Sequence, residues 1–244
     1  MTEKIVKQAP NSYCEVIGKG LIGLAFEEKP SLHLDSAAII FASGVSNSLE
    51  TNPQPYLREK KLLESVIKKK TDTDKFVYFS TLSIYDEQKQ NSAYIQHKLE
   101  LEKFIQQECQ NHLILRVPNI VGFGGNPTTL LNYLITSVME GREIKIFQNA
   151  YRNFIDVGDL VVLVKALLAS QNNATINLLH PVSYSMLEVM KYIELYTGKA
   201  SKSIYIEQGN NYFPLLNEQV KTTFEQNNID TSKNYLNQIL RKYY

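Results

Sequence analysis

The sequence of 244 residues contains no tryptophan, only two cysteines and almost no excess of charge of either sign. Because Cys14 and Cys109 cannot build a disulfide framework in a chain of this length, we expect a reducing compartment. The 26 basic and 25 acidic side chains nearly cancel, which argues against a protein that binds nucleic acid mainly by attracting phosphate. The ordinary share of hydrophobic residues, 43%, excludes wholesale disorder.

Long hydrophobic runs are absent as well. The longest, residues 160–168, is too short to span a bilayer and is interrupted by Lys165. Residues 1–10 are polar and charged and lack the apolar centre of a signal peptide. No internal repeat or low-complexity linker divides the sequence. These absences predict a soluble cytoplasmic protein that does not bind membranes.

Short β-rich runs alternate with helical patterns along the chain. Strands are expected over residues 13–17, 37–42, 75–80, 112–117 and 143–147. Helices are expected from about residue 20 to 28 and over residues 56–70, 92–107, 129–140, 157–169, 186–197 and 232–243. This alternation predicts an α/β fold in which helices cover both faces of a parallel sheet and the crossovers are right-handed.

A glycine-rich turn follows the first expected strand. Gly18, Gly20 and Gly23 match the pattern G-x-G-x-x-G and stand where a helix should begin. The first glycine permits a tight turn, the second lets backbone amides approach a pyrophosphate, and the third lets helix and strand pack closely. The pattern predicts a dinucleotide site that also includes Leu21 and Ile22, although a purely structural glycine turn would have the same sequence.

One element of the usual dinucleotide-binding pattern is missing. A second strand should carry an acidic residue about 20 residues further on, which holds the adenine ribose. Here Pro30 ends the helix, Asp35 comes too early, and the next clear strand is already the run over residues 37–42. We therefore expect a reduced sheet, with the adenosine held differently, loosely or not at all. Ala42 and Ser43, where this strand ends, are expected to border the cofactor.

A tyrosine and a lysine lie four residues apart in the helix expected over residues 92–107. Tyr94 and Lys98 therefore share one helix face, although a lysine that only snorkels from a partly buried edge is the alternative. Thr81 ends the strand upstream, at the carboxyl edge where open α/β sheets bind ligands. Since a phenol has a pKa of about 10, a positive charge such as that of Lys98 is needed to favour the phenolate at neutral pH. The three residues form a candidate proton-transfer site in which Thr81 orients the reacting oxygen.

The order of these motifs resembles that of a known family. The glycine pattern, the segment over residues 79–85 (FSTLSIY) and the Tyr94/Lys98 pair are similar to those of the extended short-chain dehydrogenase/reductases. This family includes nucleotide-sugar epimerases, dehydratases and reductases. Residues 115–122 (LRVPNIVG) resemble its strand leading to the substrate lobe, and residues 152–159 (RNFIDVGD) resemble its arginine-led segment before a helix.

The resemblance implies a Rossmann-like fold, NAD or NADP as the cofactor, and a nucleotide-sugar substrate. It implies that Tyr94 is the acid/base and that Lys98 lowers its pKa and holds the nicotinamide ribose. Asn119 and Arg152 would contact the nucleotide diphosphate, a task that suits the planar arginine fork. The implied dinucleotide-binding core is residues 1–122, rejoined by 148–180, and the implied small substrate lobe is residues 123–147 and 181–244.

Departures from the family pattern narrow the reaction. Ile17 stands where the family's usual loop has its first glycine, and the stretch that follows Thr81 is shorter than usual. Leu82 and Ser83 replace the Asp-Glu pair that the family's 4,6-dehydratases carry after the threonine. Cys109 is not where the 3,5-epimerase/reductases have their cysteine. Sugar dehydration and 3,5-epimerisation are therefore disfavoured.

The favoured function is redox chemistry at carbon 4 of a nucleotide-linked sugar, by a 4-epimerase or by a 4-keto reductase in surface-polysaccharide synthesis. Two alternatives stay open: a family member that binds a nucleotide or nucleotide sugar without turnover, and a reductase of a non-sugar carbonyl. No metal site is expected, because the four histidines are scattered, and His97 is assigned a surface or packing role. Several tyrosines near the end of the sequence are expected to serve packing or subunit contacts, and a homodimer is one alternative: Tyr235, Tyr243 and Tyr244.

Overall fold

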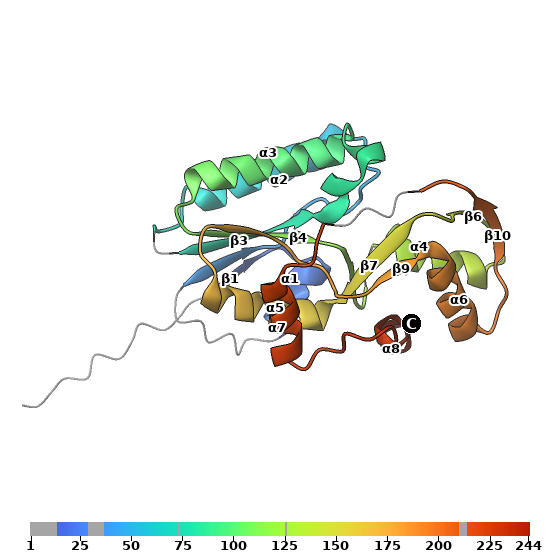
Figure 1. Ribbon diagram of the computed structural model, residues 1–244. Helices are drawn as coiled ribbons and strands as arrows, with labels where there is room; N and C mark the ends of the chain where they lie inside the picture. Colours follow the sequence, from blue (N-terminus) through green and yellow to red (C-terminus); the bar gives the residue numbers. More distant parts are fainter. Residues whose placement is uncertain (1–13, 29–36, 73, 125, 210–213) are drawn as a thin grey trace, which may run out of the picture.

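The computed structural model describes residues 14–28, 37–72, 74–124, 126–209 and 214–244, and a five-stranded sheet forms its centre (Figure 1). In spatial order the strands are β1 (Cys14–Ile17), β2 (Ala38–Phe41), β3 (Lys75–Thr81), β4 (His112–Val117) and β8 (Ala174–Asn177). All neighbouring strands are parallel. Because helices cover both faces, β2 and β3 are buried along their whole length, which explains their uninterrupted apolar runs.

Helices cover both faces of this sheet, as the sequence predicts. On one face lie α2 (Pro53–Ile67) and α3 (Ala93–Glu108), and on the other lie α1 (Leu21–Glu27), α5 (Val157–Ser170) and α7 (Glu218–Gln226) (Figure 1). The helix α2 begins before the expected Tyr56, because the Asn52 side chain accepts from the Gln54 N–H and Pro53 suits the first helical position. The predicted α/β architecture is confirmed.

The connection through α1 differs from the next two connections. From β1 to β4 the chain steps across the sheet in one direction, yet α1 lies on the opposite face from α2 and α3 (Figure 1). Because the face on which the helix lies sets the hand of a parallel crossover, the connection through α1 has the opposite hand to those through α2 and α3. The expectation that all crossovers are right-handed is therefore wrong. Contacts with α5 hold α1 on this face; Tyr13, Pro30 and Asp35 lie outside the described residues.

Smaller elements lie beyond the carboxyl end of β4. A three-stranded sheet contains β5 (Asn119–Val121), which pairs in parallel with β7 (Tyr151–Asp156), and β9 (Ser183–Ser185), which runs antiparallel to β7. A separate parallel pair consists of β6 (Glu143–Phe147) and β10 (Lys202–Ile206). The helices of this part are α4 (Leu130–Met139), α6 (Met186–Thr197) and α8 (Tyr235–Tyr243).

One hydrophobic cluster joins the two parts of the molecule. It includes Val77 of the central sheet together with Leu134 of α4 and Leu236 of α8. The division into a dinucleotide-binding core (residues 1–122 and 148–180) and a small lobe (residues 123–147 and 181–244) stays a prediction. Within residues 148–180, β7 pairs with β5 and β9, and within residues 181–244, α7 packs on α5. The first cluster therefore extends through both parts, and a second cluster lies between the central sheet and the helices α2 and α3.

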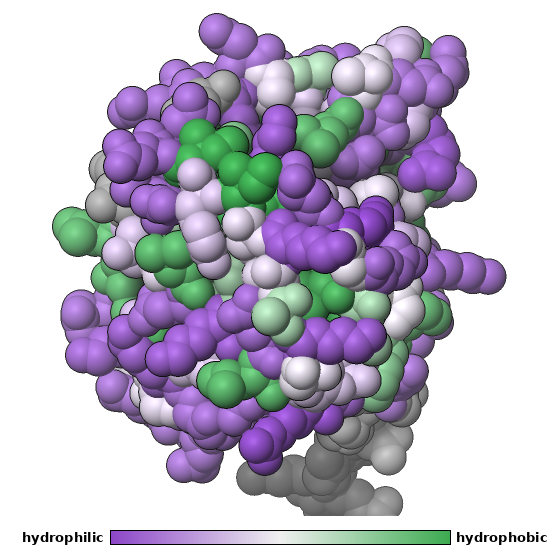
Figure 2. Space-filling model, turned by 90° about the vertical axis from the view of Figure 1, so that its right-hand side faces the viewer, coloured by the Kyte–Doolittle hydropathy of each residue, from purple (hydrophilic) through white to green (hydrophobic). Residues whose placement is uncertain are grey.

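The surface on the side of β6, β10 and α6 is mixed in character. Apolar side chains form small groups there, separated by hydrophilic residues (Figure 2). The exposed large apolar residues of these elements are Phe147, Leu187, Leu195, Ile204 and Tyr205. This face therefore presents no single continuous apolar area. Within the described ranges, no helix is both long and apolar enough to cross a membrane, and no group of three or more His, Cys, Asp or Glu residues is placed to hold a metal ion.

Candidate active site

The glycine-rich turn joins β1 to α1 and lies against the end of β2. Gly18 has a φ of +129°, and a Cβ there would lie 2.5 Å from the carbonyl oxygen of Ala42. A Cβ on Gly23 would lie 2.1 Å from the carbonyl oxygen of Gly18. Close approach therefore excludes a side chain at both positions, and the backbone conformation disfavours one at Gly18 as well. At Gly20 a Cβ would meet nothing within 4 Å, so the space beside it is open.

The other residues expected at the cofactor border this turn. Leu21 begins α1 and faces a pocket, whereas Ile22 is partly buried and packs against the core. Ala42 donates its N–H to the carbonyl oxygen of Ile17 at 2.7 Å, and the half-buried Ser43 follows it. The crowded glycines and the open space at the turn fit the pyrophosphate and nicotinamide side of a dinucleotide. Among the described residues β1 pairs only with β2, so the strand expected for the adenosine is not among them.

Tyr94 and Lys98 lie on the buried face of α3. Ser92 caps this helix, because its side chain accepts from the N–H of Ile95 at 3.3 Å. Tyr94 is 8% exposed and Lys98 is 2% exposed. The Nζ of Lys98 lies 5.9 Å from the centre of the Tyr94 ring. The structure therefore brings these two residues together, as their spacing predicts.

Thr81 is the last residue of β3 and is buried. Its hydroxyl accepts from the N–H of Ser83 at 3.1 Å, at the start of the short 3₁₀ turn Leu82–Tyr85. Ile84, within this turn, packs against the small cluster that contains Tyr94. The turn thereby joins the end of β3 to the helix that carries Tyr94.

A buried carboxylate that no sequence motif indicated pairs with Lys98. Glu59 of α2 is fully buried, and its oxygens lie 2.9 Å from Lys98 Nζ and 3.1 Å from His97 Nε2. It also accepts from the Tyr78 hydroxyl at 2.9 Å and from the Val45 N–H at 2.7 Å. Burial opposes ionisation, but the charge of Lys98 and these donors outweigh it and hold the pKa of Glu59 at about 2.

Helical spacing is the signal that could have indicated Glu59. Tyr56, Leu63 and Ile67 form the buried face of α2, and Glu59 lies between them on the same face. A charged residue in such an apolar stripe needs a partner inside the protein. His97, for which a surface or packing role was expected, is buried with its ring 4.9 Å from that of Tyr56.

A second buried carboxylate supports the strand end that carries Thr81. Glu102 of α3 accepts from Ser80 Oγ at 2.5 Å and from Arg116 Nη2 at 2.6 Å. Arg116 also donates to the Tyr85 hydroxyl at 3.0 Å. This network links α3, β3 and β4 beside Thr81, so it fixes the position of the strand end.

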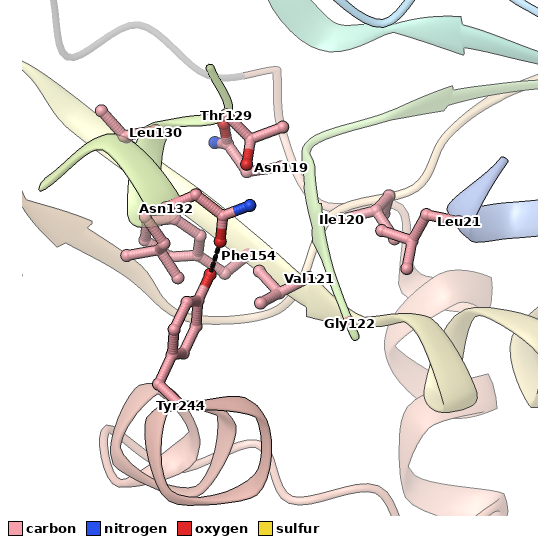
Figure 3. Close-up of a pocket in the computed structure, with 11 residues that line it drawn as sticks. Leu21, Asn119, Ile120, Val121, Gly122, Thr129, Leu130, Asn132, Phe154 and Tyr244 are labelled. Atoms are coloured by element: carbon pink, nitrogen blue, oxygen red, sulfur yellow. Dashed lines mark hydrogen bonds between the residues drawn. The ribbon is translucent and has the colours of Figure 1, made fainter. Parts of the chain in front are cut away.

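Asn119 lines a pocket beyond the glycine-rich turn (Figure 3). The pocket is small, with a cavity volume of about 20 Å³, and Leu21 lines it from the side of α1. The Asn119 side-chain amide donates to the carbonyl oxygen of Asn153 at 2.9 Å. Tyr244 closes the opposite side, where its hydroxyl donates to the side chain of Asn132 (Figure 3). Leu21 thereby connects the glycine-rich turn to the space that Asn119 borders.

Arg152 lies on β7, next to this pocket but not among the residues that line it. It is two residues before Phe154, which pairs with Asn119, so Arg152 and Phe154 point to the same side of the small sheet. Its Nη1 donates to the carbonyl oxygen of Tyr151 at 2.7 Å. Burial lowers the pKa of Arg152, and the charge of Asp86 opposes this effect.

Solved structures with the same fold include complexes with UDP-glucuronic acid and NAD, whereas no curated protein sequence matches significantly. MoeE5 in complex with UDP-glucuronic acid and NAD superposes with a TM-score of 0.71 at 17% identity, over 95% of this chain and 97% of that one. UDP-glucuronic acid 4-epimerase from Bacillus cereus, with UDP-glucuronic acid and NAD, gives 0.66 at 17% identity, over 96% and 90%. RMD from Pseudomonas aeruginosa, with NADPH, gives 0.71 at 16% identity, over 95% and 98%. Likeness at these identities shows the fold alone.

The family itself is shown by a sequence model. The model of the NAD dependent epimerase/dehydratase family matches residues 26–178, which is more than half of the chain. The match begins after the glycine-rich turn. It includes Thr81, Tyr94, Lys98, Asn119 and Arg152. The chain therefore belongs to the NAD-dependent epimerase/dehydratase family.

Proposed function

We propose that the protein is an NAD(P)-dependent 4-epimerase or 4-keto reductase of a nucleotide-linked sugar, acting in surface-polysaccharide sugar synthesis. Family membership supports the class of reaction. Similar structures hold UDP-glucuronic acid together with NAD. The observation that carries the proposal is the buried contact between Lys98 and Tyr94, 5.9 Å from Nζ to the ring centre, beside the ends of β2 and β3.

In this proposal Tyr94 takes the proton from the sugar 4-hydroxyl and returns it. The Thr81 hydroxyl orients that oxygen. Lys98 favours the ionised phenol by its positive charge and holds the cofactor ribose. A bound nicotinamide supplies the acceptor and donor of hydride. The residues assigned to cofactor binding are Gly18, Gly20, Leu21, Ile22, Gly23, Ala42, Ser43, Tyr94 and Lys98.

The substrate diphosphate is assigned to the region of Asn119 and Arg152. Asn119 borders the pocket that begins at Leu21, so a substrate there lies next to the glycine-rich turn. Arg152 lies on the strand beside Asn119, and its guanidinium suits phosphate oxygens. Thr81 contacts the sugar, in keeping with its position at the carboxyl end of β3.

A family member that binds a nucleotide sugar without turnover is the second candidate. The pairing of Lys98 with Glu59 favours it, because a lysine with a counter-ion at 2.9 Å exerts less positive potential on a neighbouring phenol. The candidates differ in one measurable property, which is hydride transfer.

Single-turnover hydride transfer with UDP, GDP, dTDP and CDP sugars tests the proposal. Tyr94→Phe removes only the phenolic oxygen, so we expect the rate to fall by about 10²–10⁴ while nucleotide-sugar binding survives. The exposed Tyr205→Phe is the matched control and should keep the wild-type rate. A Tyr94→Phe protein with near-wild-type rate contradicts the assigned role. A wild-type protein that binds a nucleotide sugar and transfers no hydride selects the second candidate.

A further inference from the structure

Glu59 lies where three segments meet: the segment after β2, the strand β3 and the helix α3. Its Oε1 accepts from Lys98 Nζ and from the Tyr78 hydroxyl, both at 2.9 Å. Its Oε2 accepts from the Val45 N–H at 2.7 Å and lies 3.1 Å from His97 Nε2. Oε1 therefore accepts two hydrogen bonds and Oε2 accepts one, while His97 Nε2 lies close to Oε2 without hydrogen-bond geometry. A carboxylate meets this demand, whereas an amide offers only one accepting oxygen.

The position of the Lys98 ammonium depends on this carboxylate. A lysine has a flexible four-carbon stem and sets no fixed geometry by itself. Here Nζ lies 2.9 Å from Glu59, 5.0 Å from the centre of the Tyr78 ring and 5.9 Å from that of Tyr94. A Cβ on Gly44 would lie only 2.8 Å from Nζ. The ammonium therefore lies between the segment after β2 and the candidate acid/base.

We propose that Glu59 is a positioning residue, whose carboxylate holds the Lys98 ammonium beside Tyr94 and ties the segment after β2 to the same point. The proposal rests on the proposed function, which gives Lys98 its task. Without Glu59, Lys98 keeps a buried charge that has no counter-ion. A charge in that situation moves toward water or is lost by deprotonation.

The expected pH effect follows from the groups around Glu59. Among the described residues, the titratable and charged groups that face it are Tyr56 of α2, Tyr78 of β3, and His97 and Lys98 of α3. If Glu59→Gln displaces Lys98, Tyr94 loses its positive neighbour. The acid limb of the plot of kcat against pH then moves to higher pH, because the phenol ionises less readily. If Lys98 instead stays in place and Glu59 only weakens its positive potential, Glu59→Gln strengthens that potential at Tyr94. The acid limb then moves to lower pH.

The test is a double-mutant cycle on the full chain, with wild type, Glu59→Gln, Lys98→Met and the double variant. We expect Glu59→Gln to lower kcat at least about tenfold, the scale of a misplaced group, and to move the acid limb to higher pH. In the Lys98→Met background, the same substitution should change kcat less than about threefold. Circular dichroism shows which variants fold, and the double variant, which removes both buried charges, should fold even if either single variant does not.

Glu102→Gln is the matched control, because Glu102 is a buried carboxylate paired with Arg116 instead of Lys98. It should change kcat by the same factor in both backgrounds and leave the acid limb in place. An equal loss from Glu59→Gln in both backgrounds, or a downward move of the limb, overturns the proposal while leaving the function intact. A wild-type protein with no turnover and no NADH binding by fluorescence overturns the proposed function, and this inference with it.

Discussion

Two buried carboxylates hold the polar side chains around Thr81 and Tyr94 in place. Glu59 pairs with Lys98, and Glu102 pairs with Arg116. Removing one partner of a buried pair leaves an uncompensated charge and costs about 3–5 kcal/mol, whereas replacing both partners is often nearly neutral. These side chains therefore set the stability of the site as well as its geometry.

Acid should weaken the protein through Glu59. Its pKa in the folded protein is about 2, below the ordinary value, so the ionised carboxylate stabilises the fold above about pH 5 and loses this effect as pH falls through 2. The contribution is about 3 kcal/mol. Urea unfolding at pH 7 and at pH 2, followed by tyrosine fluorescence, should show the gap between wild type and Glu59→Gln narrowing by about that amount. A gap that stays constant with pH contradicts the assignment.

At the scale of elements, the turn between β1 and α1 contains two glycines that the packing requires and one that it does not require. Gly18 and Gly23 have no room for a Cβ, whereas a Cβ on Gly20 would meet nothing within 4 Å. The turn ends at the carboxyl edge of the sheet, beside Ala42. The packing of α1 therefore depends on Gly18 and Gly23, whereas Gly20 keeps the space beside the turn open for a ligand.

Gly20→Val should fold normally and lose dinucleotide binding, because its side chain fills the open space. Gly18→Val is the contrasting variant. Its Cβ would lie 2.5 Å from the Ala42 carbonyl oxygen, and we expect a lower melting temperature. Circular dichroism measures folding, and fluorescence titration with NADH and NADPH measures binding. Unchanged affinity of the folded Gly20→Val protein for NADH and NADPH would show that the turn is not part of the cofactor site.

The edge position of β1 leads to a prediction about the adenosine. Only residues 29–36 separate the described parts of α1 and β2, too few for another strand–helix–strand unit, which takes about 30 residues. We expect reduced nicotinamide mononucleotide to bind within about tenfold of NADH, a difference of about 1.4 kcal/mol. Fluorescence titration of both ligands is the measurement, and AMP should not displace either one. Displacement by AMP would show that the adenosine is held after all.

At the scale of the whole molecule, α8 joins the distant parts of the chain. The Tyr235 hydroxyl donates to Asp159 Oδ2 at 2.7 Å and accepts from the Asp156 N–H at 2.9 Å, at the start of α5. Its ring stacks on that of His180 at 4.1 Å. Leu236 belongs to the cluster that also contains the central sheet. The chain should therefore unfold as one unit.

Leu236→Ala should lower the free energy of unfolding by about 2–5 kcal/mol, because it leaves a cavity at a fully buried position. The exposed Leu195→Ala of α6 should change it by less than about 0.5 kcal/mol. Far-ultraviolet circular dichroism and tyrosine fluorescence should report one coincident transition in both variants. Separate transitions would mean that the two parts fold independently.

Strong periodic patterns explain which elements could be predicted. The strands over residues 112–117 and 143–147 and the helix over 186–197 have the expected bounds. The strands β5, β7, β8, β9 and β10 and the helix α7 were not expected. These strands combine polar with apolar side chains, so no clear alternation or apolar run marks them in the sequence.

By itself the sequence determined the parallel sheet, the glycine-rich turn and the shared face of Tyr94 and Lys98, because each follows from local spacing along the chain. Only the tertiary structure decided that α1 lies on the opposite face from α2 and α3, that one hydrophobic cluster extends through both parts, and that Glu59 pairs with the Lys98 ammonium. Glu59 and Lys98 are 39 residues apart on different helices. The partner of a buried charge depends on how whole elements pack together, so it cannot be predicted from the pattern within one element.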